Sequence, residues 1–307
     1  MRLYGIDFTS APSPRKPIVV AEGRIDEGRL AVLGFEEFPC LEAWQRLFER
    51  PGPWVAALDA PLGLPRALVA ELAWPGDWSS LVAWLAAREP DTFVEQVDAL
   101  RRTRPAGARY LYRRCDRLAG AASPMNLVRP PVGRMFRAAV PTLWQARVSV
   151  LPQRPLAPED SNGRVLVEGY PGYLVRRLGI GSYKRGTTAR EDSALERERG
   201  RVIAALSGWV EVQLGLRWHL PPALAHRCRA DSRGDRLDAV ILVAQAAWVA
   251  GHLACGNPYG GLPEAADPLE GWIATVPWDE AASAASAAKR VSGGPNGPRR
   301  SGAGCHR

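Results

Sequence analysis

The stretch Arg2-Leu3-Tyr4-Gly5-Ile6-Asp7 indicates the fold, because a short apolar run leads directly into an aspartate. Short continuous apolar runs are typical of strands that are buried on both faces of a sheet. The run Trp54-Val55-Ala56-Ala57-Leu58-Asp59 ends in the same way, and Arg164-Val165-Leu166-Val167-Glu168 ends in a glutamate. Open α/β sheets place their ligands at the carboxyl ends of the strands. We therefore expect these acids at the edge of a sheet where ligands bind.

A fourth acidic element lies near the end of the chain. Asp235 and Asp238 begin a strongly apolar stretch that runs to Cys255. The stretch predicts a buried helix, and acids three residues apart share one face of a helix. The apolar run itself, from Ala239 to Cys255, is shorter than the about 20 residues that a membrane span needs, and it contains Gln245 and His252. We therefore expect a core helix and no membrane partner.

The first sixty residues follow a strand-strand-strand-helix-strand pattern. Residues 2–6, 18–21 and 30–33 read as three hairpin-linked strands, and residues 41–49 form an amphipathic helix before the strand at 54–58. Crossovers of this kind connect parallel strands with a right-handed turn. The first and last of these strands should therefore be neighbours, with Asp7 beside Asp59.

The segment 64–158 differs from the part of the chain before it. It contains three helical patterns and a Pro/Arg-rich stretch but no clear strand, so we interpret it as a mostly helical insertion in a single domain that spans residues 1–280. Residues 281–307 are rich in Ala and Ser and then in Gly, Pro and Arg, and are too poor in apolar side chains to form a core. They predict a disordered basic tail.

The bulk composition limits the location and the partners. A net charge of +8 permits attraction to nucleic acid, although part of the excess lies in the tail. Five scattered cysteines without a C-x-x-C pair, and only four histidines, exclude a zinc knuckle or a disulfide framework. With a strand at the N-terminus and no signal peptide, we expect a cytoplasmic protein. The two common glycine-rich nucleotide loops are also missing from the sequence.

Five short motifs follow one another along the chain in the order found in a known protein family. They are Gly5-Ile6-Asp7, Asp59-Ala60-Pro61-Leu62-Gly63, Glu168-Gly169-Tyr170-Pro171, Tyr183-Lys184 and Asp235-Arg236-Leu237-Asp238-Ala239. Over roughly residues 1–255 the chain resembles a bacterial and archaeal family of unknown function that is described as predicted RNase H-like nucleases. The resemblance implies an α/β fold with a mixed five-stranded sheet in the order 3-2-1-4-5, flanked by helices.

The resemblance also implies a reaction and a set of ligands. A nuclease of this fold needs two Mg²⁺ or Mn²⁺ ions, which a few carboxylates and waters can hold. We expect Asp7, Asp59 and Asp238 to be catalytic. Asp7 would bridge the two ions, and Asp59 would complete the site of one of them. Asp238, together with Asp235, would complete the site of the other. The expected reaction is hydrolysis of a phosphodiester bond in nucleic acid, or in another phosphorylated substrate.

Three further residues are expected at the periphery of this site. In the order 3-2-1-4-5 the backbone of Glu168 lies two strand spacings, roughly 10 Å, from that of Asp7. We therefore expect Glu168 to orient a ligand or to pair with Lys184 or an arginine rather than to bind the same ion. Lys184 and Arg185 are candidates for contact with a substrate phosphate.

Each acid also has an ordinary structural interpretation. Asp7 can accept hydrogen bonds from the turn at residues 9–10, and Asp59 can act as a turn former. Asp235 can serve as an N-cap or as a first-turn acid that interacts with the helix dipole. Glu168 can be a metal ligand or half of an ion pair, and the sequence leaves both open.

Two other classes of function remain open. An actin/hexokinase-like phosphotransferase or ATPase shares this core and carries acids at strand ends. Such proteins normally have Gly- and Thr/Ser-rich phosphate hairpins in two related halves, of which residues 9–10 give the only hint. A non-catalytic nucleic-acid-binding module with the same fold is the other alternative.

Overall fold

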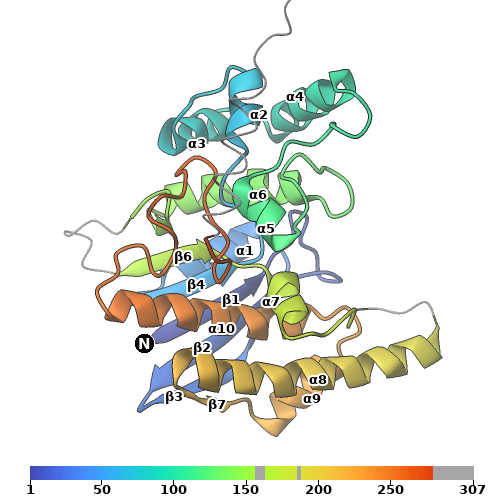
Figure 1. Cartoon of the computed structure of the whole chain (residues 1–307), viewed down its shortest axis with the longest axis vertical. Helices are drawn as coiled ribbons and strands as arrows, with labels where there is room; N and C mark the ends of the chain where they lie inside the picture. Colours follow the sequence, from blue (N-terminus) through green and yellow to red (C-terminus); the bar gives the residue numbers. More distant parts are fainter. Residues whose placement is uncertain (156–162, 185–187, 279–307) are drawn as a thin grey trace, which may run out of the picture. The chain divides into compact units, whose positions relative to one another are not determined.

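The first strand, β1 (Arg2–Asp7), lies in the middle of a seven-stranded mixed sheet in a computed structural model that describes residues 1–155, 163–184 and 188–278 (Figure 1). The strand order is β5-β6-β4-β1-β2-β3-β7. β1 pairs antiparallel with β2 and parallel with β4. The other strands are β2 (Ile18–Asp26), β3 (Arg29–Phe38), β4 (Trp54–Leu58), β5 (Ser149–Leu151), β6 (Arg164–Glu168) and β7 (Arg217–His219).

The expectation of a five-stranded sheet is wrong. The five expected strands are β1, β2, β3, β4 and β6, and they lie in the expected relative order, but β5 and β7 each extend one edge of the sheet. β5 also contradicts the expectation that residues 64–158 contain no strand. Each added strand has only three residues, which is too short for a periodic pattern to identify.

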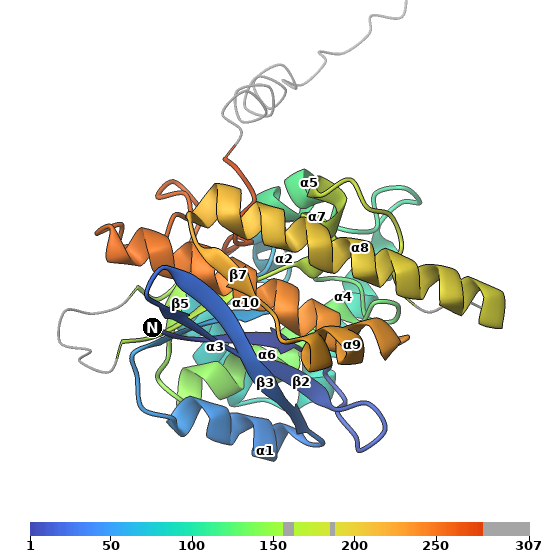
Figure 2. The same ribbon diagram turned by 90° about the horizontal axis from the view of Figure 1, so that it is seen from below.

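Helices cover both faces of the sheet. α8 and α10 lie on one face, and α1 lies on the other (Figure 2). The helices are α1 (Leu41–Gln45), the short 3-10 helix η1 (Arg46–Glu49), α2 (Arg66–Glu71), α3 (Trp78–Ala86), α4 (Pro90–Thr103), α5 (Arg114–Ala119), α6 (Val132–Gln145), α7 (Pro171–Arg177), α8 (Ala189–Leu214), α9 (Pro222–Ala230) and α10 (Asp235–Ala254).

The helical segment between β4 and β6 shares the hydrophobic core of the sheet. Phe93 of α4 and Phe136 of α6 belong to the same buried cluster as Ile6 and Leu58 of the central strands. Residues 1–276 form one compact unit, so the segment is not a separate domain. Arg185 and the predicted tail at 281–307 lie outside the described residues.

Glycine at position 5 allows α10 to pack directly on the central strand. Alternation along β1 places Tyr4 and Ile6 in the core on one face, so Gly5 and Asp7 face the other side. A Cβ atom at Gly5 would lie 2.0 Å from the carbonyl oxygen of Ala239 in α10. This close contact brings the first turn of α10 to the carboxyl end of β1.

By length and composition, α10 is the one helix among the described residues that could cross a membrane. However, 72% of its apolar window is buried inside this protein. Such burial is typical of the core helix of a soluble protein, as the sequence predicts.

Candidate metal centre

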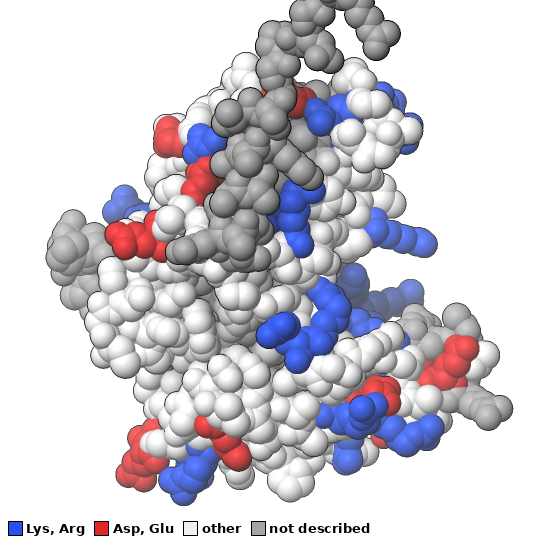
Figure 3. Space-filling view, in the orientation of Figure 1, with Lys and Arg blue, Asp and Glu red and all other residues white. Residues whose placement is uncertain are grey.

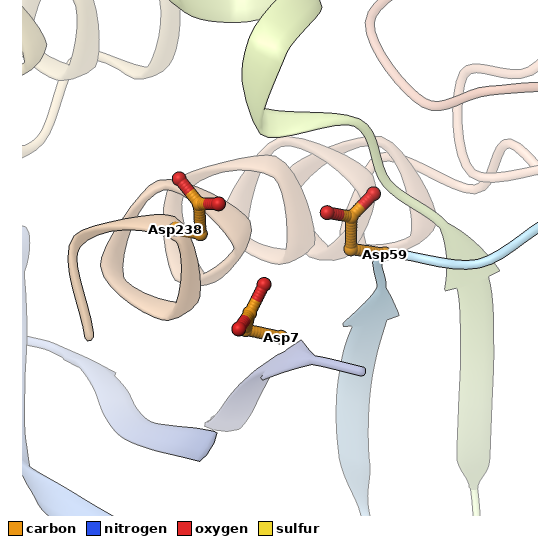
Figure 4. Close-up of side chains that lie close together, drawn as sticks. All are labelled: Asp7, Asp59 and Asp238. Carbon is orange, nitrogen blue, oxygen red and sulfur yellow. The ribbon is translucent and has the colours of Figure 1, made fainter. Parts of the chain in front are cut away.

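Three aspartates from three different elements converge at the carboxyl edge of the sheet. Asp7 ends β1, Asp59 directly follows β4, and Asp238 lies in the first turn of α10. Figure 4 shows the three carboxylates around one space, and each offers an oxygen within 4.8 Å of those of the other two. The predicted convergence is confirmed, and we call this group the aspartate cluster.

Backbone pairing fixes two members of the aspartate cluster. The Asp59 N–H donates a hydrogen bond of 3.0 Å to the carbonyl oxygen of Ile6, which continues the β1–β4 ladder beyond the strand end. The Gly169 N–H likewise donates to the carbonyl oxygen of Leu58 at 2.9 Å. Asp7, Asp59 and Gly169 therefore occupy equivalent positions on three adjacent strands.

The third member depends on the start of α10. Gly234 precedes the helix with a φ of 78°, a left-handed conformation that favours glycine. Its carbonyl oxygen accepts a hydrogen bond of 2.8 Å from the Asp238 N–H. Because Gly5 lets α10 approach β1, the fully buried Asp238 lies next to Asp7.

Charging the aspartate cluster is unfavourable. Burial and the nearby Asp238 carboxylate raise the pKa of Asp59 to about 7 and raise the pKa of Asp7 well above its usual value. Burial also raises the pKa of Asp238. Three carboxylates with these shifts need a compensating cation in order to be ionised together.

Lys184 and Tyr183 partly supply that compensation. The Tyr183 hydroxyl and the Lys184 ammonium group both donate hydrogen bonds to the Asp238 carboxylate. Burial lowers the pKa of Lys184, but the neighbouring aspartates raise it by more. Half of the Lys184 side chain is exposed. With all three carboxylates ionised, one lysine charge would leave two negative charges uncompensated.

Asp235 lies outside the aspartate cluster. Its carboxylate pairs with Arg233, with Nε 3.1 Å from Oδ2. Burial and the nearby Asp231 raise its pKa. Asp235 is therefore not among the acids whose oxygens lie within 4.8 Å of one another, although its charge contributes to the raised pKa of Asp7. Its role as a fourth metal ligand stays a prediction.

Glu168 points to the opposite face of the sheet. The strand register pairs Glu168 with Leu58, which itself pairs with Ile6. Glu168 is therefore in line with the residues that precede Asp7 and Asp59, and its side chain points to the other face of the sheet. Its carboxylate accepts two hydrogen bonds of 2.6 Å from Nη1 and Nη2 of Arg113. The predicted pairing with Lys184 is wrong, whereas the alternative of pairing with an arginine is confirmed.

Arg113 links Glu168 to a second carboxylate. Its Nη2 atom also donates to Oδ1 of Asp116 at 2.7 Å. The exposed fractions are only 1% for Arg113, 1% for Asp116 and 4% for Glu168. We call these three residues the arginine network. Sequence reasoning missed Arg113 and Asp116, because Arg113 lies 55 residues before Glu168 in a stretch with many other arginines.

The donor atoms of the aspartate cluster suit a hard divalent cation. All three residues offer carboxylate oxygens, the ligands that Mg²⁺ and Mn²⁺ favour. Neither cysteine nor histidine contributes an atom to this cluster. The donor set therefore fits the predicted cofactors better than it fits zinc or copper.

Comparison with known families gives a match over most of the chain. The family described as "Protein of unknown function (DUF429)" matches residues 5–262, which include every member of both groups of acids. No curated protein and no solved structure matches the chain. The resemblance to a family of unknown function is thereby confirmed, and its nuclease description stays a prediction. The chain belongs to the DUF429 family.

Proposed function

We propose that this protein is a divalent-metal-dependent nuclease of RNase H-like fold that hydrolyses phosphodiester bonds. The observation that supports this proposal most directly is the aspartate cluster. Its carboxylates come from β1, β4 and α10 and offer oxygens within 4.8 Å of one another. Two catalytic ions in such sites lie about 3.5–4 Å apart, and a few carboxylates with waters suffice to hold them.

The raised pKa values also support a cation at this place. Burial and the Asp238 carboxylate raise the pKa of Asp59 to about 7, so the cluster is not fully ionised at neutral pH without a compensating charge. A divalent ion would compensate the two charges that Lys184 leaves. Metal binding would therefore be coupled to the release of protons from the cluster.

Each residue of the site has a role in this proposal. Asp7, Asp59 and Asp238 would hold Mg²⁺ or Mn²⁺, which supplies Lewis-acid polarisation of a phosphate oxygen when bound. Asp59 is held by the extended β-ladder, and Tyr183 orients Asp238 through its hydroxyl group. The half-exposed Lys184 can donate a hydrogen bond to a phosphate of the substrate.

The surroundings of the site suit a polyanionic substrate. Figure 3 shows Lys and Arg side chains on both sides of an indentation, on the side of the molecule toward which β1 runs in Figure 1. Cations beside a cleft attract phosphates and raise the rate of association with nucleic acid. We propose nucleic acid as the partner, and the cytoplasm as the location.

A cleavage assay with matched variants tests the proposal. Single-stranded, duplex, hybrid and branched substrates are incubated with the protein in Mg²⁺, Mn²⁺ or EDTA, and thermal unfolding is followed with and without metal. We expect metal-dependent cleavage and a metal-induced rise in Tm, both abolished by Asp7→Asn. In EDTA this variant should be as stable as the wild type or more so, because one repelling charge is removed. Asp91→Asn, at an exposed position on α4, is the control and should retain both properties.

Two results would contradict the proposal. ATP hydrolysis without cleavage of any nucleic acid would favour the phosphotransferase or ATPase alternative. Unfolding of Asp7→Asn in EDTA would show that Asp7 is a structural residue rather than a ligand.

A further inference from the structure

A pocket of about 220 Å³ adjoins the aspartate cluster. Asp59 and Lys184 border both the cluster and the pocket. The helical segment between β4 and β6 supplies much of the opposite wall, with Ala121, Ala122 and Val132 among its residues. A ligand whose phosphate lies at the cluster can therefore extend into a cavity that this segment helps to form.

The pocket combines an apolar wall with hydrogen-bond acceptors. Glu168 and Asp116 of the arginine network also line it. Arg113 directs Nε and Nη2 to Asp116 and directs Nη1 and Nη2 to Glu168, so its donors are already engaged. Carboxylate oxygens can accept more than one hydrogen bond each. Oε2 of Glu168 and both carboxylate oxygens of Asp116 already accept two hydrogen bonds each. Oε1 of Glu168 accepts only one, from Nη2 of Arg113, and is therefore the acceptor that this wall offers to a ligand. The Lys184 ammonium group, a donor, lines the pocket beside the aspartate cluster.

The size of the pocket limits what can enter it. A volume of about 220 Å³ corresponds to about seven waters, at about 30 Å³ for each water. Drug-sized ligands occupy pockets of about 300–1,000 Å³. The cavity is thus suited to a single ring system, and a stacked base pair would not fit inside it.

We propose that this pocket binds the base of the nucleotide whose phosphate lies at the aspartate cluster, and that it selects a base with an exocyclic amino group. This inference rests on the proposed nuclease function and names its substrate class. An amino group such as N4 of cytosine can donate a hydrogen bond to a carboxylate oxygen. The O4 atom of uracil is itself an acceptor and would be repelled by that oxygen. A base in the pocket is unstacked and unpaired, so the substrate is single-stranded or has a displaced nucleotide.

Three small phosphates test this proposal on the full chain. Cytidine 5′-monophosphate, uridine 5′-monophosphate and ribose 5-phosphate share a ribose phosphate, and the two nucleotides differ mainly in the group at position 4 of the base. Their affinities are measured by calorimetry in the presence of Mg²⁺. We expect cytidine 5′-monophosphate to bind about tenfold or more tightly than either of the others.

A variant that fills the pocket gives a second readout. Ala122→Leu adds a larger apolar side chain at the wall and should remove the advantage of the cytidine nucleotide, while ribose 5-phosphate binding is retained. Ala67→Leu, at an exposed position on α2, is the matched control and should keep that advantage. If Ala122→Leu lowers Tm strongly, Val132→Phe fills the same pocket from the start of α6.

The outcomes separate this inference from the proposed function. Metal-dependent cleavage together with equal binding of all three phosphates would overturn the base pocket and leave the nuclease proposal standing. Equal binding of the two nucleotides, or an advantage of the cytidine nucleotide that survives in both filled variants, would also overturn it. Absence of both cleavage and metal-dependent phosphate binding would overturn the two proposals together.

Discussion

The aspartate cluster and the arginine network lie at the same edge of the sheet but differ in what neutralises them. In the arginine network a buried guanidinium group lies between two carboxylates and donates to both. In the aspartate cluster one half-exposed lysine faces three carboxylates. The first group satisfies its charges within the protein, whereas the second leaves a negative site that a cation from solvent can occupy.

A shift of one residue separates the two groups. Side chains alternate between the faces of a sheet, so Glu168 and Gly169 point to opposite sides. Gly169 is in line with Asp7 and Asp59, but a Cβ atom there would lie 2.3 Å from Cδ2 of Leu242 in α10. The close approach of α10 therefore leaves no room for a third strand-borne acid on its own side. The acid of β6 instead stabilises the opposite side.

The comparison distinguishes a structural group of acids from a functional one. Breaking a pair of fully buried acids and bases destabilises the fold, because removing one partner leaves an uncompensated buried charge. Acids that repel one another at a partly exposed site destabilise the protein until a ligand binds. Substitutions in the first group should therefore affect stability first, and substitutions in the second should affect activity first.

The largest effect on stability should follow the loss of the central guanidinium group. Arg113→Met leaves Glu168 and Asp116 buried without their partner, and we expect a loss of about 3–5 kcal/mol in the free energy of unfolding. Chemical denaturation measures this loss. The control is Arg102→Met, since the Arg102 side chain is 77% exposed and its surface pair with Asp98 should contribute little to stability. Equal losses in the two variants would refute the distinction between the two groups.

A smaller effect should follow a change at Glu168, which connects the two groups. Its Oε2 atom accepts a hydrogen bond of 2.9 Å from the Leu62 N–H, three residues after Asp59. Glu168→Gln removes the negative charge that pairs with Arg113 and weakens the hydrogen bond to the Leu62 N–H. We expect activity to fall about 10–100-fold, the range seen when a residue that orients a metal ligand is changed. The metal-induced rise in Tm should persist, and its complete loss would mean that Glu168 binds the metal directly.

The sequence predicts the aspartate cluster better than the arginine network for a physical reason. Asp7 and Asp59 end apolar runs on neighbouring parallel strands, and Asp238 begins an apolar helix, so local patterns indicate all three. Strands buried on both faces show no alternation, and the pattern therefore cannot tell which face Glu168 occupies. Its partner Arg113 comes from a loop between helices, and only the tertiary structure brings the two together.

The same limits explain what the sequence analysis missed in the fold. β5 and β7 are stabilised by pairing with a neighbouring strand, and three residues carry too little pattern to predict them. The helix α6 is not among the three helical patterns found in the sequence, and it contains Pro141, a residue type that normally ends or kinks a helix. In contrast, the long apolar run of α10 is sufficient to predict a core helix.

The smallest predicted effect is the pH dependence of stability without metal. Burial raises the folded-state pKa of Asp59 to about 7, and the pKa values of Asp7 and Asp238 are also raised. Between pH 5 and pH 8 the folded state therefore binds more protons than the unfolded state, so stability should fall as pH rises through this window. Tm measured in EDTA should be higher at pH 5 than at pH 8.

Acids with lowered pKa values act in a different range. The hydrogen bond and charge of Arg101 lower the pKa of Asp98, so the stability that this pair contributes is lost only as pH falls below the usual range of aspartate. Burial also raises the pKa values of Glu168 and Asp235, so these two acids act in the same direction as the aspartate cluster. Asp7→Asn should reduce the fall in Tm, and Mg²⁺ should raise Tm more at pH 8 than at pH 5, because protons compete with the metal. A wild-type Tm in EDTA that rises from pH 5 to pH 8 would show that these carboxylates are ionised and compensated within the folded protein, and would contradict this prediction.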